Sequence, residues 1–446
     1  MNSSRTILKI PCASLIHFEI LYILYIKLFI DTIGIPNAAW YLCDVINMIL
    51  IIKCIKERKG IFHKIEATHF YILFVIMLVF SLCGLLINMK GIALYVWGFR
   101  NLGRMFVFWI ICINFLNKED LIKIFRSFYF AYLINFFLSL IQYFSGIKGD
   151  NLGGIFGISG ASSAYSLNLC MIVVTLAVCG YLRYEISLRK TVFIVLISMI
   201  IAPLAELKAL YFLFSGMLLI VLLMSKKISL RILIMVAGGI IGLSLAVKVM
   251  SIVYPESLVN LTFEGMYDYL GGNNNIGYSS TNDLSRMGAI GTLHEMFFKN
   301  DFLRNIFGFG LGSCETSNFS FLNSVFYQKY GYLHYRWFFD AMLYLEMGLG
   351  GLLLFAIFGI MIFFYIRKNK RKYFDEDKSL MILATVFVIY AFVLSVYNSS
   401  LRIESGFFVY LVLAVPFILR KNKKNDGVSS CKKIFKLAKL RIKWRT

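Results

Sequence analysis

Arg100 and Arg104 are the residues of this chain whose type and spacing most directly suggest chemistry. They lie one helical turn apart inside the apolar run 92–116. A charge inside a bilayer costs about 2.5–3.5 kcal/mol on insertion scales, so its presence there asks for a reason. Two guanidinium groups at this spacing repel each other unless they share an anion, and in a water-filled cavity they could bind phosphate groups. The alternative is an internal salt bridge, for which Glu206 is the obvious partner.

A second pair of charges, Glu206 and Lys208, follows Pro203 in the apolar stretch 191–224. That stretch is too long for one helix, so we expect two short spans that meet at the proline. Non-helical backbone at membrane depth is tolerated only where protein or a water-filled cavity covers it. Lys208 is therefore either a phosphate ligand or a cation that snorkels to the outer interface.

The elements that must position these charges are membrane-length helices. Of the 446 residues, 59% are hydrophobic and only 16% are charged, whereas globular chains carry about 25% charged residues. A helix needs about 20 apolar residues to cross a bilayer. We therefore expect an all-α polytopic membrane protein with about twelve transmembrane helices, near residues 14–30, 38–55, 69–87, 92–116, 122–144, 161–182, 191–204, 207–224, 231–252, 337–366, 379–397 and 403–420. The first run lacks a small-residue cleavage site and is predicted to be a retained signal anchor.

The charge distribution predicts the orientation of these helices. The net charge is +22, and the Lys and Arg residues gather in alternate loops and at the termini, which is the positive-inside pattern and not a nucleic-acid patch. Twelve spans place every basic loop on one side, with both termini cytoplasmic. The predicted units are helices one to nine (1–252), an extracytoplasmic loop (253–336), helices ten to twelve (337–420) and a basic cytoplasmic tail (421–446). The tail either lies as an amphipathic helix on the inner leaflet or merely aids solubility.

The long loop combines three kinds of sequence. A polar Gly/Asn stretch ends near residue 282, and a helical pattern follows, with Asp283 or Ser285 as a plausible N-cap. A glycine-rich turn then contains Gly308, Gly310 and Gly312. The many Asn, Tyr, Phe and Ser residues of the long loop suit sugar recognition but equally suit an ordinary loop. Cys314 is the one cysteine well inside the loop, and the chain has no Cys-x-x-Cys motif or His/Cys cluster, so we expect no disulfide within the loop and no metal.

Several short motifs resemble the O-antigen polymerase and O-antigen ligase family. They are Gly154-Ile-Phe-Gly157, Arg286 at a helix start, Ile306-Phe-Gly-Phe-Gly-Leu-Gly312, His334 and Gly348-Leu-Gly-Gly-Leu-Leu-Leu-Phe355. The likeness covers roughly residues 90–360. It implies a GT-C-like glycosyltransferase fold in the bacterial inner (cytoplasmic) membrane. It also implies a substrate, undecaprenyl-diphosphate-linked oligosaccharide, and an inverting transfer that needs neither a metal nor another cofactor.

The resemblance also implies roles for individual residues. Arg286 matches the loop arginine of the family, and Arg104 or Arg100 matches its membrane arginine; with Lys208 they would hold the diphosphate. The turn of Gly308, Gly310 and Gly312, together with Arg336, would contact the substrate, although Arg336 and Arg402 also lie at helix ends where snorkelling is the default. His334 is the candidate general base. The chain departs from the family here, because the position expected for the histidine holds Trp337, so Asp340 is a rival base.

The leading hypothesis is therefore polymerisation of lipid-linked repeat units into a surface polysaccharide, such as O-antigen, capsule or exopolysaccharide. The closest alternative is the ligase reaction, which transfers finished glycan to an acceptor. A lipid-linked oligosaccharide flippase is the non-enzyme alternative, but transporters usually show two related halves, and none are evident. The partners implied are membrane lipids, a chain-length regulator and a flippase of the same pathway. We expect no nucleic-acid partner.

Overall fold

The computed structural model describes residues 11–56, 67–89, 91–160, 162–224, 230–253, 283–317, 319–369, 377–421 and 430–436, and over these ranges the regular structure is helical with no β-strand. Nine helices within them are long and apolar enough to cross a membrane. They are α1 (Cys12–Ile33), α2 (Tyr41–Lys56) together with the 3-10 turn Asn37–Trp40 that precedes it, α3 (Thr68–Ile87), α4 (Ile92–Phe115), α5 (Lys118–Phe144), α6 (Ser162–Leu182), α9 (Leu230–Val253), α14 (Phe339–Asn369) and α15 (Lys378–Tyr397). The all-α class is confirmed, and the nine apolar helices are compatible with a polytopic membrane protein.

Three further helices match the remaining predicted spans but are shorter. They are α7 (Leu188–Leu204), α8 (Lys208–Met224) and α16 (Gly406–Lys421). The chain breaks between α7 and α8 as the proline predicts, and Glu206 turns it with a left-handed φ of 51°. Because these helices fall below the usual spanning length, the number of twelve crossings stays a prediction.

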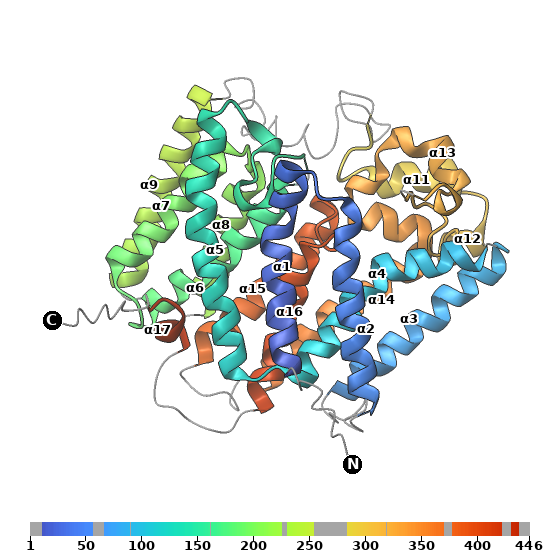
Figure 1. The fold of residues 1–446 in the computed structure, drawn as a ribbon, viewed down its shortest axis with the longest axis horizontal. Helices are drawn as coiled ribbons and strands as arrows, with labels where there is room; N and C mark the ends of the chain where they lie inside the picture. The colour runs from blue at the N-terminus through green and yellow to red at the C-terminus, as the bar shows by residue number, and fades with distance from the viewer. Residues whose placement is uncertain are drawn as a thin grey trace, which may run out of the picture.

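The connections between helices gather at two ends of the bundle. At one end, here called the site end, the Ile158 amide donates to Asp31 (2.8 Å) and the Asn88 side chain donates to the Gly308 carbonyl (2.9 Å). At the opposite end Lys118 pairs with Asp377 at 3.0 Å. Figure 1 shows α11 (Ala289–Phe297), α12 (Phe302–Phe307) and α13 (Val325–Tyr330) on the site side and α17 (Ser430–Ile434) on the other. The alternation of loops agrees with the charge pattern, and the orientation in the membrane stays a prediction.

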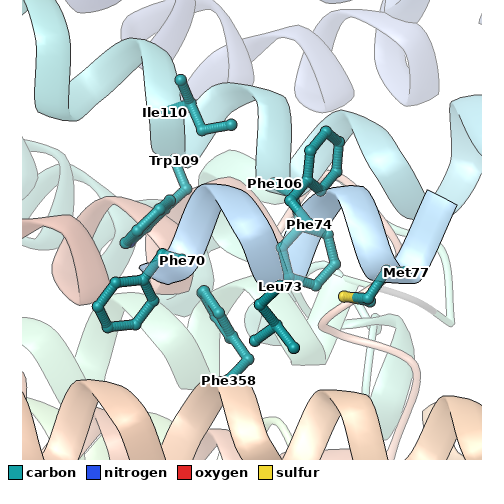
Figure 2. A pocket seen from close by; sticks show the side chains of 8 residues that line it. All are labelled: Phe70, Leu73, Phe74, Met77, Phe106, Trp109, Ile110 and Phe358. Carbon is teal, nitrogen blue, oxygen red and sulfur yellow. The ribbon is translucent and has the colours of Figure 1, made fainter. Parts of the chain in front are cut away.

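Helices α4 and α6 lie at the centre of the bundle, surrounded by other helices. The apolar window of α6 is 94% buried and that of α4 is 72% buried, against 18% for α9. Aromatic rings join α4 to α16, for example Trp109 and Phe417 with centroids 5.2 Å apart. A void of about 10 Å³ lies between α3, α4 and α14 (Figure 2), lined by Phe70, Leu73, Phe74, Met77, Phe106, Trp109, Ile110 and Phe358. Such a space holds at most one water, so it is a packing gap and not a ligand site.

The part of the basic tail that the structure describes packs against the bundle. Cys431, Ile434 and Phe435 are buried, and the Arg126 side chain donates to the Lys433 carbonyl at 2.8 Å. Of the two alternatives for the tail, the amphipathic helix on the inner leaflet (432–445) does not hold for residues 432–436, because the apolar side chains of Ile434 and Phe435 are covered by protein. Residues 437–445 of that helix, and the polar stretch that ends near residue 282, lie outside the described residues.

Candidate functional site

An apolar cavity of about 370 Å³ opens between α6, α8 and α15. That volume is in the usual range for small-molecule sites, which are mostly apolar with a few polar groups. Its walls are lined by Met171, Lys208, Ala209, Phe212, Leu213, Gly216, Met217, Ile220, Val386, Ile389, Tyr390, Val393 and Tyr397. Lys208 begins α8 and Tyr397 ends α15, so both lie at the site end of this cavity.

The cations at this end come from two distant segments. Lys208 Nζ lies 3.0 Å from Glu206 Oε1. Arg286 Nε donates to the Tyr397 carbonyl at 3.2 Å, and its guanidinium lies 5.0 Å from the centre of the Tyr397 ring. Desolvation and the charge of Glu206 raise the pKa of Asp150, while Lys208 and Arg286 oppose that rise. The structure thus brings together two of the predicted diphosphate ligands.

His334 forms a dyad with an acidic residue that the sequence pattern had suggested as a helix cap. Its Nδ1 lies 2.7 Å from Asp283 Oδ1, and its ring stacks on Trp337 with centroids 4.2 Å apart and planes 2° apart. The Leu284 amide donates to the Leu333 carbonyl at 3.5 Å, which joins the two segments. Of the two predicted caps, Asp283 binds His334, whereas Ser285 Oγ accepts a hydrogen bond from the Gly288 amide at 3.1 Å. The helical pattern begins as a turn, and α11 starts only at Ala289.

Asp340, the rival base, lies in the first turn of α14. It is 5% exposed, and its Oδ1 accepts a hydrogen bond from the Ala341 amide at 2.7 Å. A carboxylate held inside the protein in this way offers little surface to a sugar hydroxyl.

Arg100 and Arg104 are paired with carboxylates of the chain itself. Arg100 Nη2 lies 2.7 Å from Asp44 Oδ2, and Arg104 Nη2 lies 2.9 Å from Glu404 Oε1. Arg104 Nη1 is also 4.0 Å from Asp44 Oδ1, so the anion that the two arginines share is a side chain. Their ion pairs involve α2 and the 398–405 turn, whereas Glu206 pairs with Lys208. The geometry favours the internal salt bridge over a diphosphate site for these two arginines.

Arg402 was expected to snorkel at a helix end, and that prediction is wrong. The residue is 7% exposed, and its Nη2 lies 2.5 Å from Glu315 Oε1 and 2.6 Å from Glu346 Oε2. Arg336, whose side chain is 41% exposed, lies 3.8 Å from Glu315 Oε2. Burial alone would raise the pKa of Glu315, but Arg402 and Arg336 hold it below its usual value. Glu346, an acidic residue inside the apolar run Leu343-Tyr-Leu-Glu-Met347, was the sequence signal for a buried partner.

The glycine-rich turn is wedged between helices. The Phe309 amide donates to the Leu345 carbonyl (2.8 Å) and the Gly312 amide donates to Glu346 Oε1 (2.9 Å), beside a kink in α14 at Gly348. Gly308, Gly310 and Gly312 have φ of 68°, 91° and 78°. A Cβ at Gly312 would overlap the Leu94 carbonyl. Packing therefore accounts for these glycines, and substrate contact stays a prediction.

Within the described ranges no group of three or more His, Cys, Asp and Glu side chains is placed to hold a metal ion. Compared with models of protein families and with curated proteins, the sequence matches none of them. The resemblance to O-antigen polymerases and ligases therefore rests on the short motifs, and the site must be argued from its geometry.

Proposed function

We propose that this protein is a membrane glycosyltransferase that joins undecaprenyl-diphosphate-linked oligosaccharide repeat units into a cell-surface polysaccharide. The reaction would take place at the outer face of the bacterial cytoplasmic membrane. One observation carries the proposal: an apolar cavity ends at Lys208 and at Tyr397, which holds Arg286. A polyprenyl diphosphate has the matching parts, since its hydrocarbon chain suits the apolar walls and its diphosphate suits two cations.

The proposed chemistry is an inverting displacement. A hydroxyl oxygen of the acceptor attacks the anomeric carbon of the donor, and the bond from that carbon to the diphosphate oxygen breaks, with its electrons leaving on the diphosphate. Lys208 and Arg286 stabilise the negative charge that develops there. The hydroxyl proton passes to a general base, for which His334 and Asp340 are the candidates. No step needs a metal, and the pathway partners would be a flippase and a chain-length regulator.

The test is elongation of lipid-linked glycan by the full-length protein in proteoliposomes. The substrate is the lipid-linked repeat unit extracted from the native host after deletion of this gene. We expect a ladder of longer glycans on a gel, and loss of that ladder in Lys208→Ala and Arg286→Ala. Lys248→Ala is the matched control, because Lys248 is an exposed lysine on α9 away from the cavity lining.

Other outcomes would reject the proposal in distinct ways. Transfer of glycan to a non-lipid-linked acceptor without a ladder would indicate the ligase reaction. Movement of the lipid-linked glycan across the bilayer without elongation would indicate a flippase.

A further inference from the structure

We infer that Asp283 is a positioning residue that holds His334 in the tautomer of a general base, and that His334 removes the proton from the acceptor hydroxyl. The inference rests on the proposed function and goes beyond it by choosing between the two candidate bases. It also gives a role to a residue that the helical pattern had suggested only as a cap.

The Asp283–His334 hydrogen bond fixes where the imidazole proton lies. The distance between Asp283 Oδ1 and His334 Nδ1 is 2.7 Å. An ionised carboxylate can only accept, so Nδ1 must carry the hydrogen, and Nε2 of the neutral ring then keeps its lone pair. That lone pair is what a general base needs.

Trp337 fixes the orientation of the same ring. The His334 and Trp337 planes are 2° apart, with centroids separated by 4.2 Å. One edge of the imidazole is held by Asp283 and one face by Trp337, while the His334 side chain remains 43% exposed. His334 also has a left-handed φ of 52°. Such backbone strain costs on the order of 1–3 kcal/mol in a non-glycine residue and is concentrated at functional sites.

Asp283 also ties the base to the proposed diphosphate site. It lies three residues before Arg286, which contacts Tyr397 at the cavity end. One short segment therefore carries both the residue that orients the base and a cation for the leaving group. In the reaction the acceptor O–H bond breaks and its proton moves to Nε2, while the diphosphate leaves from the anomeric carbon. The Asp283 carboxylate then stabilises the imidazolium.

The first experiment measures the tautomer and does not depend on activity. Full-length protein labelled with ¹⁵N only at its five histidines is placed in lipid bilayers at alkaline pH for solid-state NMR. The His334 signals are assigned by their loss in His334→Gln. We expect the Nδ1–H tautomer in the unaltered protein and a shift to the Nε2–H tautomer in Asp283→Asn, whose amide can donate to Nδ1. An Nε2–H tautomer in the unaltered protein would overturn the inference.

The second experiment measures elongation by the same variants, with the extracted lipid-linked repeat unit as substrate. Asp283→Asn should lower kcat by on the order of 10²–10⁴-fold, with KM within about twofold, and Asp283→Glu should recover part of the loss. Asp301→Asn is the control, since Asp301 caps α12 through its side chain and lies at the surface. Equal melting temperatures for these variants would exclude a folding defect.

Failure of the proposed function and failure of the Asp283–His334 inference give different results. If the unaltered protein elongates nothing, the proposed function fails, and the NMR result still decides whether Asp283 sets the tautomer. If elongation is normal in Asp283→Asn, or is lost in Asp340→Asn while His334→Gln stays active, the inference fails and the proposed function stands.

Discussion

At the scale of single residues, the cation at the cavity end already has a carboxylate beside it. The Lys208 and Glu206 side chains are 14% and 24% exposed, and their charged atoms are 3.0 Å apart. Partly exposed pairs of this kind contribute about 0–1 kcal/mol. A diphosphate, with more charge than one carboxylate, could therefore compete for Lys208, and under the proposed function Glu206 would be a weak competitor for that cation.

Removing that competitor should strengthen binding of the lipid carrier. In Glu206→Gln we expect the KM for lipid-linked repeat unit to fall several-fold, by about 1 kcal/mol or less of binding free energy, with little change in kcat. Glu295→Gln is the matched control, because Glu295 forms a surface pair with Lys299 at 2.6 Å, with both side chains 61% exposed. A higher KM in Glu206→Gln would mean that Glu206 positions Lys208 for the substrate and does not compete with it.

At the scale of elements, the described part of the segment before α14, from residue 283 onward, is fastened to the bundle through the glycine turn and through Arg402. The turn enters between α3, α4 and α14, where Gly84, Gly98 and Gly348 allow the backbones to approach closely. Arg402, from the α15–α16 turn, joins Glu315 of the segment to Glu346 of α14. These contacts set the position of the segment that carries Asp283 and His334.

Two reasons for a glycine at position 312, its close contact with the Leu94 carbonyl and its left-handed φ, can be tested separately. Gly312 and Gly34 both have φ of 78°, but a Cβ at Gly312 would overlap the Leu94 carbonyl, whereas a Cβ at Gly34 meets nothing within 4 Å. Gly34→Ala should cost only the left-handed strain, about 1–2 kcal/mol. Gly312→Ala should lower the melting temperature much further and reduce expression. Similar melting temperatures for the two variants would show that the turn can move away from α4.

The carboxylates of Glu315 and Glu404 should make the stability of the fold depend on pH. Opposing burial, Arg402 lowers the pKa of Glu315, and Arg104 likewise lowers the pKa of Glu404. A lowered pKa in the folded state gives stability that is present above the unfolded value of about 4.3 and is lost as pH falls through the folded value. Thermal unfolding followed from pH 7 to pH 3 should therefore show a falling melting temperature below about pH 4.

In the Arg402→Met variant, stability should change with pH in the opposite direction. Glu315 and Glu346 then lose their shared cation while still buried, which costs about 3–5 kcal/mol at neutral pH. Without Arg402 the effect of burial on the pKa of Glu315 is opposed by Arg336 but no longer by Arg402, so that pKa rises. Protonation then relieves part of this cost, and the variant should become more stable as pH falls from 7 to about 5. Parallel pH profiles for the two proteins would show that Arg402 does not control these carboxylates.

Local features of this fold were predictable, and long-range pairings were not. Each predicted apolar run corresponds to a helix, and the break at Pro203 is present, because hydrophobic length and proline act within a few residues. The partner of Arg104 lies 300 residues away, at Glu404, and not at Glu206. Asp283 resembled a cap for the residues after it but binds His334, 51 residues further on. A single sequence carries no signal for such distances.

At the scale of the whole molecule, the polar residues of the proposed site, Lys208, Arg286 and His334, lie at one end of the bundle, and the apolar cavity runs from that end between α6, α8 and α15. The cavity end, the Asp283–His334 dyad and the 398–405 turn are joined there by Arg286, Tyr397 and Glu315. At the opposite end, the described part of the tail connects α5, α7 and α15, for example through the contact of Lys190 with the Phe435 carbonyl. The site end has to face outward for a reaction on exported lipid-linked glycans.

That orientation can be measured with two single substitutions. Lys299→Cys lies at the site end with a 61% exposed parent side chain, and Glu119→Cys lies at the opposite end with a 52% exposed parent side chain. The positive-inside pattern predicts that a membrane-impermeant maleimide labels position 299 in intact cells and position 119 only after permeabilisation. The unsubstituted chain gives the background, since seven of its nine cysteines are buried. The reverse labelling would place Lys208, Arg286 and His334 on the cytoplasmic side, where flipped repeat units are not found, and would exclude polymerisation at the outer face.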